Sequence, residues 1–493
     1  MTYKKLFTKL ANNKTADTIT NNINTVVDSS LLPHQSRIVR RITDPETKGL
    51  LLWHGLGSGK TRSSIEALKA LKPETASVVV PAALMDNYKK ELDKWYPDYK
   101  KNTKLDLISQ QNLAKSDDAS LSKDLIIVDE AHRARNLKSK LFKNLLNATR
   151  DAKKVLLLSG TPVYNNPSDL TAPISLIRGE RKGVTGSTRG FEHNFLSDSI
   201  LNSKRVLKNK AQLQEILSKY VDYYGGSKTN FPDVINEAYR VPMAARQKEL
   251  FVAAISKMNP RTKLILQSQL RPEKRDLSKL LPFFSGLRAL ANTNAGMELN
   301  PLLEDDPKID KAFNLLAKGL KKDPNFKAIV YSNYLNSGIH AYAKHLKENK
   351  IPYGEFSGVM NKNVRDDLVK QYNKNKLKVL LLSSAGGEGL DLKNTKLVQI
   401  LEPHYNNEKL DQVIGRAIRY KSHEGLPPEE RKVTIQQFLA DAGLDRRGRP
   451  IKSVDDWLYD MSQRKTELNK QVKELAEKMH NPTFGEKLKY LLT

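Results

Sequence analysis

At 493 residues the chain is long enough for two to four domains of ordinary size, each with its own core. Its 83 lysines and arginines outnumber 55 aspartates and glutamates, and the net charge of +28 favours a polyanionic partner such as nucleic acid over a merely soluble basic surface. Cysteine is absent, which excludes disulfides and thiolate metal sites, and no apolar run reaches the roughly 18 residues of a membrane span. We therefore expect an intracellular protein with no membrane partner.

Residues 1–28 are polar, rich in Asn and Thr and without a convincing period, and they predict a loosely attached lead-in. The string Leu31-Leu32-Pro33-His34-Gln35 follows it. The amide of Gln35 both donates and accepts hydrogen bonds, so this side chain could read the edge of an adenine. The alternative is an ordinary surface glutamine after a proline turn.

The first strong signal is a short apolar strand, Leu50–Trp53, that runs into a glycine-rich turn and then a helical pattern. Gly57 and Gly59 allow the backbone around Ser58 to curl, with its N–H groups aimed at phosphate oxygens. Lys60 adds a positive charge, and Thr61 adds a hydroxyl for Mg²⁺. The match to Gly-x-x-x-x-Gly-Lys-Thr is imperfect because His54 occupies the first glycine position. The turn predicts an ATP site.

A second signal lies in the apolar strand Leu125–Val128, which ends in Asp129-Glu130-Ala131-His132. Earlier strands are predicted at 78–80, followed by Pro81 and Ala82, and near 105–108, with helices between them, a rhythm typical of a doubly wound parallel sheet. Ligands of such sheets bind at the carboxyl ends of the strands. We expect Asp129 to hold Mg²⁺ and Glu130 to orient or deprotonate the attacking water, although paired carboxylates can also merely cap a helix.

A further buried strand, Val155–Leu158, ends in the small residues Ser159, Gly160, Thr161 and Pro162. Residues from about 165 to 305 then break the alternation of strand and helix. Their amphipathic patterns, rich in Lys and Arg, predict a largely helical basic insertion.

The alternation returns with apolar strands at 328–332, 379–384 and 397–401. The second of these leads into the glycine-rich segment 385–391, and Gln412 opens a helical pattern that contains Arg416 and Arg419. Two arginines three residues apart share one helix face and could neutralise charge that develops on a γ-phosphate. A pair of solvated surface arginines is the alternative. Residues from Ser453 to about Met479 predict an amphipathic helix laid against the core, with a role in DNA or partner binding as the minority interpretation.

Taken in order, these segments resemble the motif series of superfamily 2 helicases over residues 31–440. The correspondence runs from Gln35, the adenine-reading glutamine, through 57–61 as the first motif, Pro81 and Ala82 in the next, 129–132 as the DEAH box, 159–162 as the third motif, Ser332 in the fourth, 384–391 as the fifth and 412–419 as the sixth. The resemblance implies an α/β fold of two RecA-like parallel-sheet domains, with ATP and Mg²⁺ bound between them.

The same resemblance implies roles for single residues. Lys60, Asp129, Glu130, Arg416 and Arg419 would be catalytic, with Thr61 and Asp129 on the metal. The remaining assignments are ATP binding by Gln35, Gly57, Ser58, Gly59, Gly389 and Asp391, coupling by Ser159, Thr161 and Gln412, and nucleic-acid binding by Pro81, Ala82, Ser332, Ser384 and Gly386.

The implied domains are a lead-in (1–28), a first RecA-like domain (29–170), a helical insertion (171–306), a second RecA-like domain (307–445) and a C-terminal helical tail (446–493).

Within that superfamily, Leu31–Gln35, His54–Thr61 and the strings 159–166 and 415–420 resemble the Snf2-related branch, in which the place of His54 needs no glycine. The strings 414–423, 426–427 and 453–455 are similar to helicases of large cytoplasmic DNA viruses, of the poxvirus nucleoside triphosphate phosphohydrolase I and early transcription factor small-subunit types. Asp391 departs from the branch, because Snf2 remodellers usually carry Asn there, and this argues against a remodeller while leaving the ATPase intact.

The expected function is ATP hydrolysis that drives movement along duplex DNA, in the service of viral transcription. The alternatives are a transcription factor subunit that binds promoter or RNA polymerase with a secondary ATPase, a packaged virion component that binds DNA passively, and an RNA helicase. If the chain is viral, we expect it in the virion and the host cytoplasm.

Overall fold

The computed structural model describes residues 30–480 apart from 56, 117–120, 199–204, 227–230, 268–273, 296–304, 357–359, 384–389, 405–406 and 420. The chain divides into two compact units. Unit 1 comprises residues up to Ser197, Val206–Gly226 and the chain from Leu468, and unit 2 comprises Asp198–Arg205 and Ser227–Glu467.

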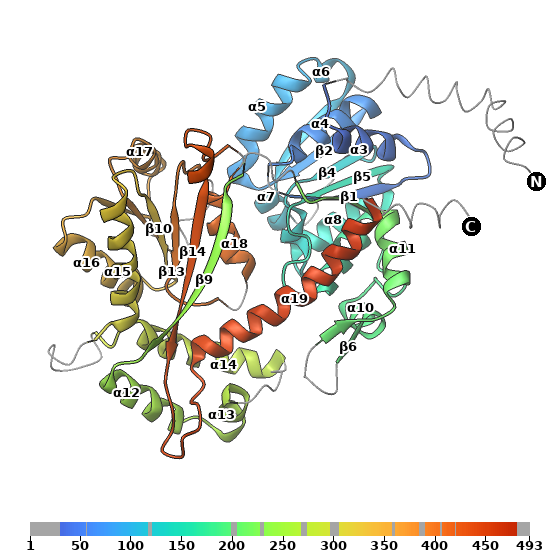
Figure 1. Ribbon diagram of the computed structural model, residues 1–493. Coiled ribbons are helices and arrows are strands. Elements are labelled where there is room, and N and C mark those ends of the chain that lie inside the picture. Colours follow the sequence, from blue (N-terminus) through green and yellow to red (C-terminus); the bar gives the residue numbers. More distant parts are fainter. Residues whose placement is uncertain are drawn as a thin grey trace, which may run out of the picture. The chain divides into compact units, whose positions relative to one another are not determined.

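Unit 1 is built on a six-stranded sheet of order β3-β2-β4-β5-β1-β8, in which every neighbouring pair is parallel (Figure 1). Its strands are β1 (Gly49–His54), β2 (Thr75–Val80), β3 (Lys104–Ser109), β4 (Leu125–Val128), β5 (Lys154–Ser159) and β8 (Val221–Tyr224). The central strands read as unbroken apolar runs because helices cover both faces of a parallel sheet. The predicted strands therefore coincide with the observed ones, and the predicted fold class is confirmed.

Successive residues of each strand enter two different cores, as the period of two requires. Leu50 and Leu52 of β1 pack with α3 (Pro33–Thr43), α4 (Lys60–Leu71) and α5 (Met85–Trp95). Leu51 and Trp53 point to the opposite core. That core contains side chains of α7 (Gln110–Lys115), α8 (Lys140–Asp151), α9 (Thr171–Arg178), α10 (Thr188–Phe195) and α11 (Lys210–Tyr220).

Unit 2 has a second six-stranded sheet, of order β11-β12-β10-β13-β14-β9, which is also parallel throughout (Figure 1). Its strands are β9 (Asp233–Pro242), β10 (Ala328–Tyr331), β11 (Tyr353–Phe356), β12 (Val379–Leu382), β13 (Leu397–Ile400) and β14 (Lys432–Asp441). One face packs on α15 (Pro307–Lys322) and α16 (Ala341–Glu348). The other packs on α17 (Lys362–Asn373) and α18 (Asn407–Ala417).

A separate helical cluster of unit 2 surrounds Trp457, which is 1% exposed. It contains α12 (Ala245–Ser256), α13 (Pro260–Gln267), α14 (Lys274–Asn292) and the first part of α19 (Val454–His480). The indole N–H of Trp457 donates to the carbonyl of Ile265 at 3.1 Å, so this large side chain is anchored as well as buried.

The predicted insertion, residues 171–306, is not a separate part of the fold. Its strand β8 completes the sheet of unit 1, and its ten-residue strand β9 pairs with β14 along the edge of the sheet of unit 2. Periodicity missed both strands because β8 is only four residues long and most of β9 is exposed.

The predicted C-terminal helix is present as α19. Residues Val454 to Met461 belong to the helical cluster of unit 2, whereas Leu468, Val472 and Ala476 are buried in the core of unit 1. A charged contact fixes the start of α19, because Lys308 Nζ lies 2.7 Å from Asp455 Oδ2 with both side chains almost fully buried. Within the described ranges, no helix combines the length and apolar character needed to cross a lipid bilayer.

Candidate nucleotide-binding site

The glycine-rich turn connects β1 to α4 in unit 1. Gly57 and Gly59 have φ values of 71° and 75°, which side-chain-bearing residues rarely adopt. A Cβ at Gly59 would also lie 2.6 Å from Gln35 Nε2, so a larger residue there would displace the Gln35 amide as well as strain the backbone. Because α4 begins at Lys60, the N–H groups of its first turn have no partner within the helix and are suited to an anion.

The side chain of Lys60, at the end of the turn, reaches back to the backbone at its start. Its Nζ donates to the carbonyl oxygens of His54 at 3.1 Å and Gly55 at 3.2 Å. Burial lowers the pKa of Lys60, and the carboxylates of Glu130 and Asp129 oppose that shift. The first motif and the DEAH box therefore share one electrostatic environment, as the sequence predicts.

Asp129 follows β4 and is 9% exposed. Burial and then the neighbouring charge of Glu130 raise the pKa of Asp129 to about 6. Its Oδ1 accepts the backbone N–H of Glu130 at 2.9 Å, and Gln110 Nε2 donates to its carbonyl oxygen at 2.6 Å. A buried carboxylate short of compensating charge is suited to a divalent cation.

Glu130 has a left-handed backbone, with φ 48° and ψ 46°. Such a conformation is uncommon for a residue other than glycine, Asn or Asp, and it turns the chain sharply between β4 and η2 (Ala131–Ala134). Burial opposes ionisation of Glu130, but the hydrogen bond and charge of His132 outweigh it and hold the pKa of this carboxyl below its usual value. Glu130 is therefore an ionised acceptor at neutral pH.

His132 links the DEAH box to the third motif. Its Nδ1 lies 3.2 Å from Glu130 Oε2 and 3.1 Å from Ser159 Oγ. The same Ser159 hydroxyl accepts the backbone N–H of Thr161 at 3.1 Å, and the His132 ring stacks on Tyr164 with centroids 5.9 Å apart. Ser159 and Thr161 thus connect to the predicted base through one imidazole, which is a physical route for the coupling role that the resemblance implies.

The site contains a network that the sequence analysis missed. Asp222, fully buried in β8, accepts two hydrogen bonds from Arg37 at 2.7 and 2.8 Å, one from Arg41 at 3.2 Å and a contact from His54 Nε2 at 2.9 Å. His54 is the residue that takes the place of glycine at the start of the phosphate turn. Burial lowers the pKa of His54 despite the Asp222 carboxylate, so the imidazole is neutral and donates its Nε2–H to Asp222.

A cavity of about 330 Å³ lies beside the turn, between the start of α3 and the end of β8. His34 forms one wall, stacked on Tyr224 with ring centroids 3.8 Å apart, and its Nε2 is 2.8 Å from the carbonyl oxygen of Ser58. Gln35 is buried next to Gly59, and its Oε1 accepts the N–H of Leu32 at 3.0 Å. Ligand pockets of this volume accommodate small organic groups such as a nucleoside.

The donor set fits Mg²⁺ and a triphosphate. The Thr61 hydroxyl and the Asp129 carboxylate are the hard oxygen ligands that Mg²⁺ prefers, and the backbone N–H groups of 57–61 with Lys60 match phosphate oxygens. When bound, the metal would neutralise charge on the phosphates. The chain's own groups would orient those phosphates, and the ionised Glu130 carboxylate has the charge that a proton acceptor for an attacking water needs.

The residues predicted to contact nucleic acid differ in their exposure to solvent, and two of them are not described by the structure. Pro81 is buried and Ala82 is exposed at the carboxyl end of β2, where the Ala82 N–H donates to Gln111 Oε1 at 3.0 Å. Ser384 and Gly386 lie outside the described residues.

Ser332 differs from the prediction, because it is fully buried and cannot touch a nucleic acid directly. Its hydroxyl lies 3.0 and 3.1 Å from the two carboxylate oxygens of Glu402, which also accepts from Asn292 at 3.1 Å. A Cβ at Gly338 would lie only 2.0 Å from Ser332 Oγ, which shows how closely the next turn packs over this serine. Ser332 therefore supports the loops after β10 and β13.

Arg416 and Arg419 do not share a helix face, contrary to the prediction. Helix α18 ends at Ala417, because the Ser422 hydroxyl bonds to the carbonyl oxygens of Ala417 at 3.3 Å and Arg419 at 2.8 Å. Arg419 lies in the turn beyond that end, with its guanidinium 3.9 Å from Asp391 Oδ1. The fifth and sixth motifs therefore meet through Asp391 and Arg419. Gly389 and the side chain of Gln412 lie outside what the structure describes.

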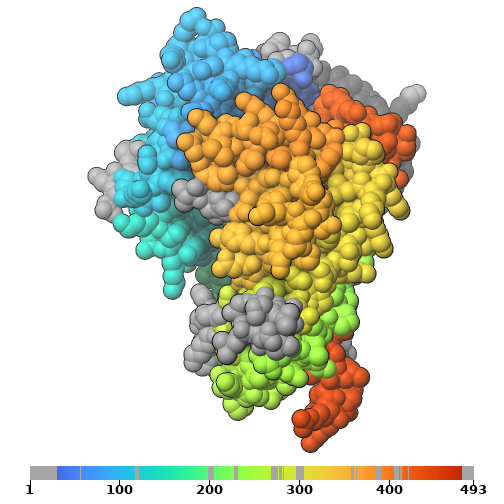
Figure 2. Space-filling model, turned by 90° about the vertical axis from the view of Figure 1, so that its left-hand side faces the viewer, coloured from blue at the N-terminus to red at the C-terminus, as the bar shows by residue number. Residues whose placement is uncertain are grey.

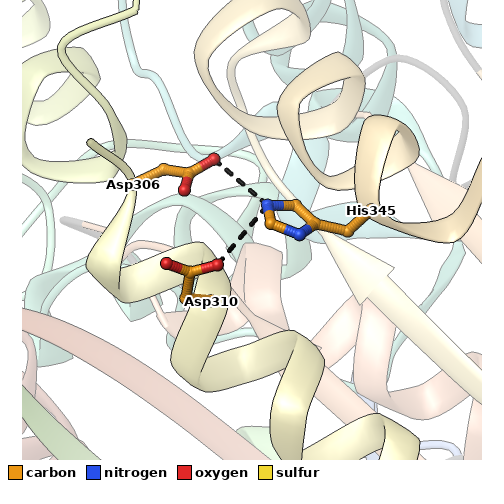
Figure 3. Close-up of side chains that lie close together, drawn as sticks. All are labelled: Asp306, Asp310 and His345. Atoms are coloured by element: carbon orange, nitrogen blue, oxygen red, sulfur yellow. Dashed lines mark hydrogen bonds and ion pairs between the residues drawn. The ribbon is translucent and has the colours of Figure 1, made fainter. Parts of the chain in front are cut away.

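A second cluster of metal-ligating types lies in unit 2 (Figure 3). His345 Nε2 is 3.2 Å from Asp306 Oδ2 and 3.7 Å from Asp310 Oδ1. The hydrogen bond that His345 donates to Asp306 raises the pKa of His345, which favours the imidazolium between two carboxylates. We interpret the cluster as an ion-paired contact between α15 and α16, since a protonated imidazole accounts for its geometry without a metal.

Two parallel sheets, a phosphate-binding turn and an ionised Glu after β4 define an ATPase of the superfamily 2 helicase class. Models of known families match in the same order. They are the type III restriction enzyme res subunit over residues 28–164, the SNF2-related domain over 103–295 and the helicase conserved C-terminal domain over 308–421. The chain is thus an Snf2-related helicase.

More narrowly, the chain belongs to the Snf2-related helicases of large DNA viruses. It is 30% identical to a protein of Acanthamoeba polyphaga mimivirus named as an ATP-dependent RNA helicase, covering 90% of this chain and 96% of that protein. It is 23% identical to the termination factor NPH-I homologue of African swine fever virus, over 88% of this chain and 76% of that protein. It is 24% identical to nucleoside triphosphatase I of Heliothis armigera entomopoxvirus, over 90% of this chain and 78% of that protein.

Among solved structures, the helicase domain of Pyrococcus furiosus Hef aligns with 87% of this chain and 97% of that chain, at 14% identity and a TM-score of 0.49.

Proposed function

We propose that this helicase hydrolyses Mg²⁺-ATP when it is bound to duplex DNA, and that it uses the energy to move along the duplex during viral transcription. The observation that carries the ATPase is the convergence of Lys60 with the Asp129 and Glu130 carboxylates at the end of β4. The net charge of +28 supports a nucleic-acid partner bound mainly through phosphates. The name of the African swine fever virus relative supports a transcription role.

Within this proposal, the chain's residues divide the work. Lys60 and the N–H groups of the turn hold phosphate oxygens, and Thr61 with Asp129 would hold the metal. Glu130 accepts a proton from water, and His132 fixes its carboxylate while connecting it to Ser159. The cavity lined by His34 would take the base and ribose, because His34 also contacts the phosphate turn at Ser58.

RNA is the second candidate substrate, and a specific observation favours it. Three mimivirus relatives, including the one that is 30% identical, carry RNA helicase in their names. Phosphate-backbone contacts alone do not separate DNA from RNA. RNA polymerase or a transcription factor subunit remains the proposed protein partner, on the strength of the termination factor name.

The deciding experiment measures ATP turnover with no nucleic acid, single-stranded DNA, duplex DNA and RNA. We expect the largest stimulation with duplex DNA and the loss of nearly all turnover in Glu130→Gln. Glu74→Gln is the matched control, since Glu74 is exposed at the opposite end of the same sheet. Greater stimulation by RNA than by duplex DNA would indicate that RNA is the substrate. Full activity of Glu130→Gln would overturn the ATPase assignment.

A second experiment tests the arginines of the sixth motif. If Arg416 and Arg419 neutralise the γ-phosphate, Arg419→Ala should lower nucleic-acid-stimulated turnover by about 10³-fold or more. Lys421→Ala, two residues away and exposed, is the control. Wild-type turnover in Arg419→Ala would remove that arginine from the mechanism.

A further inference from the structure

The chain between β14 and α19 folds into a basic turn, residues Leu444–Pro450, which we call the basic tip. Its two ends pair as an antiparallel bridge between Leu444 and Pro450, and the N–H of Ile451 donates to the carbonyl of Gly443 at 2.8 Å. The tip stands out from the surface of unit 2 beside α12 and α13 (Figures 1 and 2). None of the sequence motifs described above includes it.

A single carboxylate fixes the conformation of the tip. Asp445 Oδ1 accepts the N–H groups of Arg447 at 2.8 Å and Arg449 at 2.9 Å, while its Oδ2 accepts the guanidinium of Arg449 at 2.9 Å. The N–H of Gly448 closes the turn on the carbonyl of Asp445 at 3.0 Å, with a φ of 73° that suits glycine. The backbone of the tip is therefore a hydrogen-bonded turn from which Arg446 and Arg447 project at adjacent positions.

The base of the tip is attached to two helices. Lys248 of α12 donates to the carbonyl of Leu444 at 3.1 Å. The side-chain amide of Gln267 at the end of α13 exchanges two hydrogen bonds with the backbone of Lys452, at 3.0 and 3.1 Å. These contacts attach the base of the tip to the helical cluster around Trp457.

Two positive charges of the tip have no counterion. Arg449 is paired with Asp445 and Lys452 with Asp460, but Arg446 and Arg447 are exposed and have no carboxylate partner within the described part of the chain. An unpaired guanidinium presents several N–H donors in a fixed fork that matches phosphate oxygens. The tip therefore offers two such groups on adjacent residues.

The kind of partner follows from what else is exposed. Protein interfaces have an apolar or aromatic centre, whereas interfaces with nucleic acid are more polar and strongly positive. The one large apolar side chain exposed in the tip is Leu444, at its base, and no aromatic residue lies within 444–450. We propose that Arg446 and Arg447 bind the sugar–phosphate backbone of the nucleic acid on which the helicase acts. This inference rests on the proposed function, because it adds a contact to that same substrate.

The test measures binding of a fluorescently labelled duplex DNA, and of a single-stranded RNA of mixed sequence, over a series of salt concentrations. Arg446→Ala/Arg447→Ala is compared with Lys321→Ala/Lys322→Ala, which removes equal charge from exposed residues at the end of α15. Each lost contact with duplex phosphate should lower the slope of log K against log salt by about 0.9, which is roughly eightfold in affinity at about 0.1 M salt. We expect about sixtyfold weaker binding in the tip variant, little change in the control, and basal ATP turnover without nucleic acid at the wild-type level in both.

Equal affinity and equal salt slope in the tip variant and wild type would overturn the inference and leave the tip as a surface for an acidic protein. The proposed function would survive that result. Failure of the wild-type protein to bind either nucleic acid would instead contradict the proposed function, and the inference would fall with it.

Discussion

The Arg37 guanidinium donates two hydrogen bonds to the Asp222 carboxylate, at 2.7 and 2.8 Å, although the two residues are 185 positions apart in the sequence. Asp222 is fully buried, whereas the Arg37 side chain is 30% exposed. This contact binds the helix that carries Gln35 to the edge strand of the sheet, next to the residue at which the phosphate turn begins.

Asp222→Asn should destabilise the protein and weaken ATP binding. Removing one partner of a buried ion pair costs about 3–5 kcal/mol, and the partial exposure of Arg37 places this pair at the lower end of that range. The KM for ATP should rise because His54 loses the carboxylate that orients it. Asp106→Asn, on the exposed face of β3, is the control and should change stability by less than about 0.5 kcal/mol. Denaturant unfolding and ATP titration measure both effects, and an unchanged unfolding midpoint would contradict the first.

Asp129→Asn should stabilise the protein at neutral pH while it abolishes turnover. The pKa of Asp129 is raised to about 6 in the fold, so the stability that the carboxyl contributes is complete below its unfolded value of about 3.8 and is lost as the pH rises through 6. The ionised group then costs about 3 kcal/mol, which the amide does not. Unfolding in Mg²⁺-free buffer should show a larger gain at pH 8 than at pH 5. A gain that does not vary with pH would exclude titration of this carboxyl as the cause.

His132→Gln should move the acid limb of the pH–rate profile upward. Burial raises the pKa of Glu130, and the His132 imidazole reverses that shift, so without it Glu130 takes up a proton at a higher pH. Because a protonated Glu130 cannot accept a proton from water, kcat/KM should fall at a higher pH than in wild type. Tyr164→Phe is the control, since it keeps the ring that stacks on His132. An acid limb at the same pH in His132→Gln and wild type would indicate that a group other than Glu130 determines the loss of activity at low pH.

Lys308→Met should cost about 3–5 kcal/mol, because it leaves the Asp455 carboxylate buried without a counterion. Lys308→Met/Asp455→Asn should recover part of that loss, since the amide oxygen can still accept the Ala440 N–H that bonds to Asp455 at 3.0 Å. Arg240→Met breaks the more exposed pair with Asp456 and should cost less than about 1 kcal/mol. Unfolding midpoints of wild type, Lys308→Met, Asp455→Asn and the double variant measure the coupling, and simple additivity of the two single effects would contradict it.

Local sequence was sufficient wherever one strand and the turn after it carry the chemistry. The apolar run before the phosphate turn and the run before Asp129 each specify a buried parallel strand, and the glycines specify the conformation of the turn. These signals depend on neighbouring residues, so they are visible without a structure.

Contacts between distant segments were not predictable in this way. Nothing near Asp222 signals that Arg37 and His54 surround it, and β9 is too exposed to show the pattern of a buried strand. The end of α18 depends on the Ser422 hydroxyl, which caps carbonyl groups three and five residues upstream. That is why Arg419 was assigned to a helix it does not occupy. Ser332 was predicted to bind nucleic acid because nothing in its local sequence signals its burial against Glu402, 70 residues away.

The pairing of β9 with β14 also affects how the protein is made. About 190 residues separate the two strands, and at a synthesis rate of roughly 5–20 residues per second β9 leaves the ribosome some ten to forty seconds before its partner. The core of unit 1 is completed later still, because Leu468, Val472 and Ala476 are made after both β9 and β14. The sheet of unit 2 therefore cannot be completed until β14 has been made, and in the meantime its apolar strands are incompletely paired and open to misassembly.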